Sequence, residues 1–528
     1  MSQVQIYDTT LRDGAQREGI SFSLVDKIHI VEKLDEMGIH YIEGGWPGSN
    51  PKDAEFFARM RAMRLANSKV VAFGSTRRPH TRAEKDANLI ALTETGMKIA
   101  TLVAKNSILH VTQVLETSPE ENLRMITDSV HFLIHKGMLV FYDAEHYFDG
   151  YKADKDYALL CLRTAAEAGA ASLILCDTNG GSLPEEIAEG VKAACQVSGV
   201  QVAIHAHNDS GLGVANTLAA VQAGASQIQG TINGYGERCG NANLCVIIPA
   251  LKLKMGIDCI TDGQLAKLTE VSRNISEVAN LVHDPFMPYV GASAFSHKAG
   301  IHVSGMSKWK DSYQHVDPEK VGNQLRITVS ELSGKQNIIL KAREMGLDLS
   351  SGDSDAQKLL EQVKTLESLG FQYDQAEASF ELLIRRTRPD YQPPFKLVDF
   401  MTVVEKRRRP PSRETKEDIL SEAMVKVTVG SELIHTAAEG NGPVNALDAA
   451  LRKALLQYYP SLSRVKLVDY KVRILEESVG TGSQVRVLIE SSDGENEWHT
   501  VGSSTNIIEA SWLALADSLE YWLIKHSK

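Results

Sequence analysis

The chain has 528 residues, 43% apolar and 23% charged, a balance that excludes a mainly disordered protein. Its net charge of -11 disfavours a nucleic-acid-binding protein, because such proteins usually carry a basic surplus. The longest uncharged stretch, residues 210–236, contains many Asn, Gln and Gly residues, so we expect no membrane span. The six cysteines are scattered and no basic-then-apolar leader is present, which predicts a reducing, cytoplasmic setting.

Short apolar runs alternate with helix-like stretches in the first 255 residues. Residues 24–34 and 123–133 show the 3.6-residue apolar period of helices packed on a sheet. Eight strand–helix units of this size predict a parallel (β/α)8 TIM barrel. An open doubly wound sheet is the alternative, but no GxGxxG follows the first strand. The eight predicted strands are Val4–Tyr7, His40–Glu43, Val70–Phe73, Lys98–Val103, Met138–Tyr142, Ser172–Cys176, Val202–Ala206 and Ser226–Thr231.

The remaining chain divides into two further sections. Helix-like segments at 329–345, 355–369 and 375–386 predict an α-helical linker section. The last section repeats itself with an offset of 64 residues, since His435-Thr436 aligns with His499-Thr500. Each copy has an alternating strand followed by an Ala/Leu-rich helix, so we expect an α+β domain with a two-fold internal repeat and ligands between copies or chains. The predicted domains are a barrel at 1–280, the linker at 281–393 and the repeat domain at 394–528.

A basic run at residues 406–409 precedes two prolines within the third section. A solvated linker or a subunit contact is the ordinary interpretation of such a run.

Polar side chains gather where the predicted strands end. In a barrel of this type the active site lies at the carboxyl ends of the strands, so these side chains are expected to meet. They are Asp8, Arg12, Asp13, Glu43, Asp143, Glu145, Asp177, Thr178, His205, His207, Asn208, Asp209, Asn233, Glu237, Arg238 and Asn241.

The sharpest candidates for a metal site are His205 and His207. Side chains two apart on a strand point to the same side, so both imidazoles can share an ion. Asp13 could complete the ligand set, and Asn241 is expected nearby. Mixed nitrogen and oxygen ligands allow Mn, Zn, Co or Mg. Two hydrogen-bonded core histidines are the structural alternative.

Other polar residues admit a functional and a structural interpretation. Arg12 could place a cation beside the metal or form an ion pair within its loop. Glu145 could be a general base or a barrel-mouth salt bridge. Thr178 could bind a substrate carboxylate or cap a helix. The glycine-rich segment 230–240 could approach an anion or form a tight turn without a ligand.

Four motifs resemble one enzyme family, the metal-dependent acyl-transfer barrels called DRE-TIM metallolyases. They are Asp8–Gly14 (DTTLRDG), His205–Asp209 (HAHND), Gly234–Asn241 (GYGERCGN) and His297–His302 (HKAGIH). The tail, with EGNGPVNA at 439–446 and VGSS at 501–504, resembles the regulatory domain of isopropylmalate and citramalate synthases. The resemblance spans nearly the whole chain.

Within this family the chain is most similar to the citramalate synthases. The segments that carry this likeness are 45–53 (GWPGSNPKD), 143–150 (DAEHYFDG) and 233–236 (NGYG). Isopropylmalate synthases usually have Asn-Gly directly before Glu-Arg, so Tyr235-Gly236 departs from their pattern. Isopropylmalate and homocitrate synthases remain close alternatives, because one pocket residue can change the preferred 2-oxo acid.

The resemblance implies a Claisen-type condensation of acetyl-CoA with pyruvate, followed by thioester hydrolysis to (R)-citramalate and CoA. It implies that a divalent metal is held by four residues, Asp13, His205, His207 and Asn241. Arg12 would stabilise the developing negative oxygen and Thr178 would bind the pyruvate carboxylate. Glu145 would remove the acetyl methyl proton, helped by His302.

The resemblance also implies a homodimer, because the helical section of relatives can reach a neighbouring subunit's barrel. It implies isoleucine as the effector of the C-terminal domain. A lyase or decarboxylase on the same barrel is a less favoured alternative, because such enzymes usually lack this tail. A barrel that has lost catalytic activity and only senses an amino acid through the tail is a further alternative. The complete set of candidate metal ligands argues against it.

Overall fold

The protein is described here by a computed structural model covering residues 4–330, 332–347, 353–406, 419–475, 480 and 482–526. It divides into two compact units. One comprises Met1–Phe295 with His315–Leu325, and the other comprises Ser296–Gln314 with Arg326–Lys528. The predicted domain boundaries at 280 and 393 remain a prediction. No helix within the described ranges has both the length and the apolar character that a membrane crossing requires.

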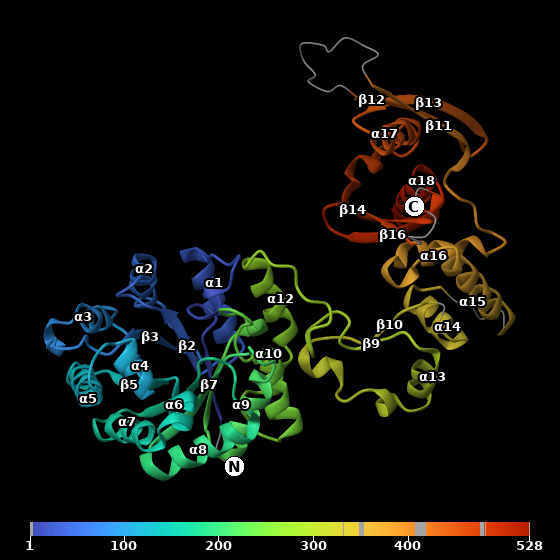
Figure 1. Ribbon diagram of the computed structural model, residues 1–528. Helices are drawn as coiled ribbons and strands as arrows, with labels where there is room; N and C mark the ends of the chain where they lie inside the picture. The colour runs from blue at the N-terminus through green and yellow to red at the C-terminus, as the bar shows by residue number, and fades with distance from the viewer. Residues whose placement is uncertain are drawn as a thin grey trace, which may run out of the picture. The chain divides into compact units, whose positions relative to one another are not determined.

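The first unit is a closed barrel of eight parallel strands. Figure 1 shows strands of this sheet with helices around them. Each predicted strand overlaps an observed one, and the last strand pairs with the first to close the sheet. The predicted TIM barrel is therefore confirmed, and the open sheet is excluded. The strands are β1 (Gln5–Asp8), β2 (Tyr41–Gly45), β3 (Lys69–Ser75), β4 (Ile99–Lys105), β5 (Leu139–Glu145), β6 (Ser172–Asp177), β7 (Gln201–Ala206) and β8 (Gln227–Gly230).

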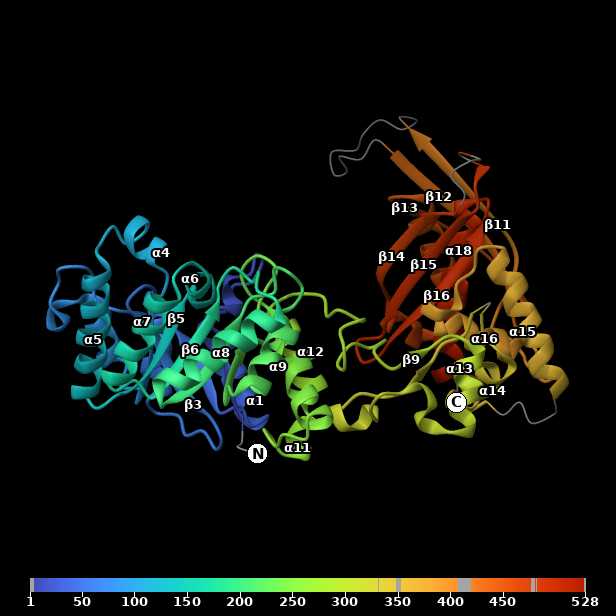
Figure 2. The same ribbon diagram turned by 60° about the horizontal axis from the view of Figure 1, so that its bottom comes forward.

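Helices cover the outside of the barrel (Figure 2). Local sequence explains where several begin: Ser23 caps the first helix through its Oγ, which accepts the Asp26 N–H at 3.2 Å. The helices are α1 (Leu24–Glu36), α2 (Pro51–Met60), α3 (Ala87–Glu94), α4 (Ile108–Gln113), α5 (Pro119–His135), α6 (Tyr147–Ala153), α7 (Lys155–Glu167), α8 (Pro184–Ser198), α9 (Gly213–Ala223), α10 (Leu244–Pro249), α11 (Asp262–Leu265) and α12 (Leu268–Val278).

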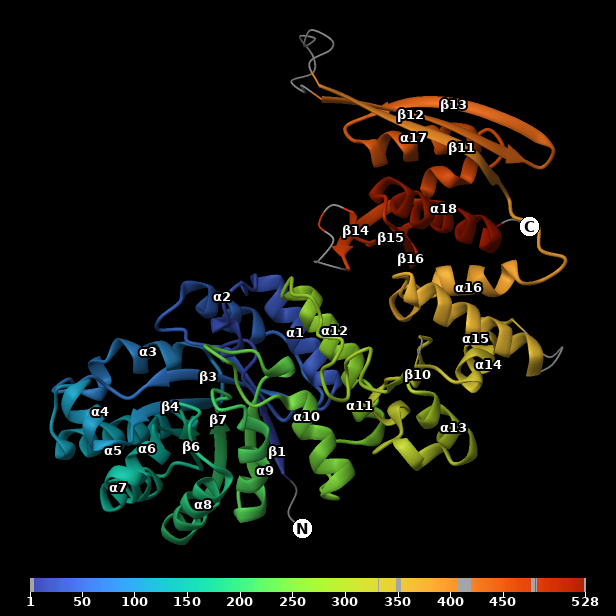
Figure 3. The same ribbon diagram turned by 45° about the vertical axis from the view of Figure 1, so that its right-hand side comes forward.

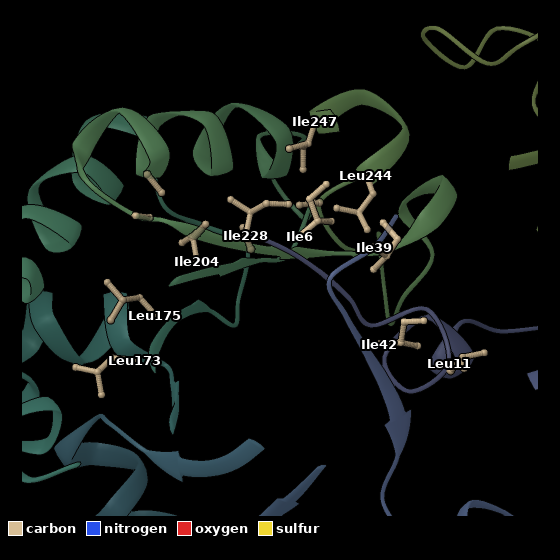
Figure 4. Packing of buried hydrophobic residues seen from close by; sticks show 14 of the residues in the cluster. Ile6, Leu11, Ile39, Ile42, Leu173, Leu175, Ile204, Ile228, Leu244 and Ile247 are labelled. Carbon is tan, nitrogen blue, oxygen red and sulfur yellow. The ribbon is translucent and has the colours of Figure 1, made fainter. Parts of the chain in front are cut away.

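Side chains of the barrel strands alternate between two apolar layers. Outward residues such as Ile6, Leu173 and Ile204 pack against the helices, as the close view in Figure 4 shows. Inward residues such as Tyr7 and Phe141 fill the barrel interior. Burial on both faces explains why strands such as β4 and β6 contain continuous apolar runs in the sequence. The packed interior leaves the carboxyl ends of the strands as the place for polar chemistry.

A buried ion pair holds α5 against the loop after β3. The Glu121 carboxylate accepts hydrogen bonds from Arg77 Nη1 at 2.8 Å, from the His80 N–H at 3.0 Å and from Arg124 Nε at 2.8 Å. Burial alone would raise the pKa of Glu121, but these donors lower it from 4.5 to about 2. Because Arg77 also lines the cavity described below, the pair stabilises one wall of that cavity.

Glu121→Gln is expected to destabilise the barrel in a pH-dependent way. Loss of the charged acceptor costs roughly 2 kcal/mol at pH 7, or about 4 °C in thermal midpoint. A carboxylate with a lowered pKa stabilises the fold above its ordinary pKa, so the difference should shrink as pH falls from 4.5 towards 2. Thermal unfolding at pH 7 and pH 3.5 measures it. The exposed neighbour change Glu120→Gln is the control, and an equal loss in both variants would contradict the expectation.

The second unit begins with a small, mainly helical part. The predicted helices at 355–369 and 375–386 correspond to α15 (Asp353–Ser368) and α16 (Glu377–Arg386). The helix expected from 329 starts later, as α14 (Lys335–Glu344), because the Ser330 N–H donates to Ser333 Oγ in a turn before it. The other elements are α13 (Gly300–Lys308) and two short parallel strands that the sequence did not predict, β9 (Ser296–His297) and β10 (Arg326–Ile327).

The predicted C-terminal repeat is present as two modules, each a three-stranded antiparallel sheet packed on one helix (Figure 3). Equivalent hydrogen bonds link sheet and helix: Thr436 Oγ1 donates to the Ala450 carbonyl, and Thr500 Oγ1 to the Ala514 carbonyl, both at 2.7 Å. The basic run at 406–409 lies outside the described residues after Lys406. The modules comprise β11 (Lys396–Lys406), β12 (Ile419–Val429), β13 (Glu432–Gly440) and α17 (Pro443–Leu455), then β14 (Lys466–Ile474), β15 (Val485–Ser492), β16 (Glu497–Ser504) and α18 (Ile507–His526).

Candidate metal-dependent active site

A cavity of about 490 Å³ opens at the carboxyl ends of the barrel strands. Its floor is lined by side chains that point into the barrel, one each from β3, β5, β6 and β7. These are Phe73, Asp143, Cys176 and His205. Most candidate site residues of the barrel line the same cavity, namely Arg12, Asp13, Glu145, Thr178, His205 and His207.

Three buried side chains converge on one point of this floor. Asp13 Oδ2 lies 3.2 Å from His205 Nε2 and 4.0 Å from His207 Nε2. Their possible ligand atoms all lie within 4.8 Å of one another. Asn241 joins them, since its Nδ2 is 2.8 Å from Asp13 Oδ2. The four residues predicted as metal ligands are thus brought together, from three separate parts of the chain.

The polar atoms of this cluster fit a bound cation. His207 Nδ1 and Asn241 Oδ1 are buried and have no hydrogen-bond partner among the described residues. His205 Nδ1 lies 2.9 Å from Gln229 Oε1, so a proton on Nδ1 leaves the Nε2 lone pair facing Asp13. One carboxylate, two imidazoles and an amide oxygen suit a divalent metal ion. The cluster could therefore hold such an ion.

The electrostatics of the cluster follow from burial and close charges. Burial alone would raise the pKa of Asp13, but Arg12 and the two histidines hold it well below its ordinary range. Burial and the neighbouring His205 lower the pKa of His207 from 6.5 to about 4. At neutral pH Asp13 is therefore an anion and His207 a neutral imidazole, the forms in which both residues bind metals.

Arg12 is a fixed cation beside the cluster. Its Nε donates to Glu43 Oε2 at 2.6 Å, and its guanidinium carbon lies 4.0 Å from the centre of the Phe73 ring. Tyr7 donates to the other oxygen of Glu43 at 2.7 Å, which fixes the carboxylate in turn. Arg12 Nη1 is 3.6 Å from Asp13 Oδ1, so the positive charge faces the proposed metal site and the cavity.

Glu145 and Thr178 lie on the wall of the cavity. Glu145 forms an ion pair with Lys105, its register partner on β4. Thr178 Oγ1 accepts the His146 N–H at 2.8 Å, which leaves its hydroxyl proton to donate elsewhere. His146 holds a left-handed backbone conformation (φ 58°) and stacks on His110 with ring centres 3.7 Å apart.

His302 belongs to the second unit, on α13. It is exposed, and its ring stacks on Tyr313 at 4.2 Å. The structure places it with His297, whose ring centre is 6.0 Å away. Its predicted role beside Glu145 therefore stays a prediction.

Several residues around the site were not given a role by sequence reasoning. Glu43 and Asp143 were recognised only as polar strand ends, yet Glu43 anchors Arg12 and Asp143 contacts the thiol of Cys176. Burial raises the pKa of Asp143 from 3.8 to about 6. Gln229 and Lys105 were missed entirely. A polar residue inside a strand that must be buried on both faces is the signal that could have revealed Gln229.

Comparisons with known proteins agree with this geometry. Residues 3–275 match the HMGL-like family model, 289–370 match the homocitrate synthase post-HMGL domain-like model, and 367–523 match the LeuA allosteric (dimerisation) domain. An (R)-citramalate synthase of Geobacter sulfurreducens is 52% identical over 99% of this chain and 98% of its own length. One from Aquifex aeolicus is 50% identical over the same shares. A 2-isopropylmalate synthase of Methanocaldococcus jannaschii is 30% identical over 100% of this chain and 96% of its own.

The closed barrel and its Asp–His–His–Asn cluster define a barrel enzyme with a candidate metal site at the carboxyl ends of its strands. The similarity to citramalate synthases extends over nearly the full chain, whereas the isopropylmalate synthase is more distant. The chain therefore belongs to the HMGL-like family and, within it, to the family of (R)-citramalate synthases.

Proposed function

We propose that this protein condenses acetyl-CoA with pyruvate and hydrolyses the thioester, giving (R)-citramalate and CoA. The observation that carries the proposal is the 52% identity to a citramalate synthase over 99% of the chain. The cluster of Asp13, His205 and His207 at the cavity floor supports it. In this reaction the protein acts as an acyltransferase, and the acetyl group that it transfers becomes an alkyl group of the product.

The cavity residues have the chemistry that this condensation needs. A divalent metal ion held by Asp13, His205, His207 and Asn241 would supply Lewis-acid polarisation of the 2-oxo group. Arg12 stabilises the oxygen that becomes negative when the acetyl carbon attacks, because it is a half-buried permanent cation facing the cavity. The Thr178 hydroxyl donates to the pyruvate carboxylate. Glu145 accepts the proton from the acetyl methyl group, assisted by His302.

Release of free thiol from acetyl-CoA tests the proposal directly. The full chain is assayed with Mn²⁺ or Mg²⁺ and four acceptors: pyruvate, 2-oxobutanoate, 2-oxoisovalerate and 2-oxoglutarate. The highest kcat/KM is expected with pyruvate. A preference for 2-oxoisovalerate or 2-oxoglutarate would favour an isopropylmalate or homocitrate synthase, and no thiol release with any acceptor would favour a lyase.

The C-terminal modules support a proposal about regulation and assembly. Residues 367–523 match a domain described as allosteric and dimerising, so we expect a homodimer. Isoleucine is the proposed effector, because citramalate leads towards a 2-oxo acid precursor of isoleucine. Isoleucine is therefore expected to lower the turnover of the full chain, and leucine at the same concentration is expected to have little effect. Equal inhibition by both amino acids, or none by either, would contradict this assignment.

A further inference from the structure

The segment from Asn233 to Asn241 is a tight turn whose glycines lie very close to neighbouring atoms, among them the side chain of the proposed metal ligand Asn241. Gly236 has φ +157°, and a Cβ at this position would lie 2.4 Å from Asn241 Oδ1. A Cβ on Gly240, at φ +91°, would lie 2.1 Å from the Gly234 carbonyl oxygen. Only glycine fits such approaches. The place of the Asn241 amide therefore depends on how this turn is held.

Two side chains of the turn attach it to α12. Tyr235 is buried, and its hydroxyl lies 3.0 Å from Ser276 Oγ. Asn233 Nδ2 donates to the same Ser276 Oγ at 3.0 Å and to the Ser272 carbonyl at 2.9 Å. Because α12 packs on the outside of the barrel, these bonds connect the turn to a rigid helix.

The ring of Tyr235 also contacts the loop that carries Asp13. The Arg17 guanidinium lies 5.4 Å from the ring centre, within the range of a cation–π interaction. The Arg17 N–H donates to the Gly14 carbonyl at 3.2 Å, so Arg17 belongs to the turn that follows Asp13. One aromatic side chain of the segment that supplies Asn241 thus contacts both α12 and the loop that supplies Asp13.

We propose that Tyr235 is a positioning residue of the metal site. It holds Asn241 and Asp13 at their separation by linking both segments to α12, and it contacts none of the reacting atoms. The inference rests on the proposed function, since it assumes that these residues bind the divalent ion. It also gives a physical role to the Tyr235-Gly236 pair by which the sequence departs from isopropylmalate synthases.

The test is Mn²⁺ binding by the full chain, measured by titration calorimetry and by the electron paramagnetic resonance of free Mn²⁺. Tyr235→Phe keeps the ring over Arg17 but removes the hydroxyl, and Ser276→Ala removes its partner. Each is expected to raise the Mn²⁺ dissociation constant about 10-fold, the effect typical of residues that orient metal ligands. The loss of affinity in the double variant should be smaller than the product of the two single losses, because both changes remove the Tyr235–Ser276 bond, while Ser276→Ala also removes the acceptor of Asn233 Nδ2. Saturating Mn²⁺ should restore kcat.

Tyr151→Phe is the matched control, because the Tyr151 hydroxyl on α6 donates a long bond to Glu189, at 3.4 Å, outside the proposed metal site. It should leave Mn²⁺ binding unchanged. A dissociation constant for Tyr235→Phe within twofold of the unmutated protein would overturn the proposal. Additive losses in the double variant would also overturn it. If the unmutated chain binds no Mn²⁺, the metal site of the proposed function fails, and this inference fails with it.

Discussion

His207→Ala is expected to abolish measurable Mn²⁺ binding and to lower kcat at least about 10³-fold. His207 Nε2 faces the Asp13 carboxylate, and the side chain is buried at the cavity floor. Its removal takes away one of the four proposed metal ligands. The other three are held on their own parts of the chain and cannot take its place. Loss of Lewis-acid stabilisation worth several kcal/mol corresponds to a rate decrease of this size. Calorimetric Mn²⁺ titration and the thiol-release assay measure the two effects.

The control for this change is another histidine outside the cluster. His29 on α1 bonds to Asn274 at 3.0 Å, so His29→Ala removes a partly buried imidazole without touching the cavity. It should bind Mn²⁺ as the unmutated chain does. Both variants should retain a thermal unfolding transition. Retention of full turnover by His207→Ala would mean that His205 on β7 and His207 just after it are hydrogen-bonded core residues, the structural alternative that the spacing alone leaves open.

The barrel was predictable because its strands must be buried on both faces. Residues 173–176 and 202–204 form short continuous apolar runs, and helix-period stretches separate them from their neighbours. The length of this region indicated the number of strand–helix units, since eight such units fill about 250 residues. By contrast, the strands β9 and β10 have two residues each, too few for any period to show.

The candidate site was predictable in its members but not in its pairings. Residues two apart at the end of β7 were expected to share a side and strand ends were expected to meet, so Asp13, His205 and His207 could be grouped from sequence. The hydrogen-bond partner of each polar group depends on which inward-facing residues of the neighbouring strands lie at the same height in the barrel. Thus the bond from His205 to Gln229 follows from the register of β7 with β8, and the bond from Arg12 to Glu43 follows from the pairing of β1 with β2. Spacing along the chain contains no such information.

Glu145→Gln is expected to lower kcat by about 10² to 10⁴-fold while leaving the KM for pyruvate within about threefold of its original value. The amide keeps the shape of the side chain but cannot accept the acetyl methyl proton. Pyruvate contacts are assigned to Arg12 and Thr178, which the change does not alter. The thiol-release assay, with pyruvate and acetyl-CoA varied in turn, separates the two constants.

Lys105→Met is the matched control, since it breaks the same ion pair and leaves the carboxylate in place. Deuterated acetyl-CoA then distinguishes a base from a structural salt bridge. If Glu145 removes the methyl proton, the primary isotope effect on kcat should increase in Glu145→Gln, because proton removal becomes rate-limiting, and should stay near its original value in Lys105→Met. Equal losses in both variants without an isotope effect would show that the pair supports the cavity wall. The proton acceptor would then have to be sought among the other carboxylates that line the cavity, of which Asp143 is buried on the floor.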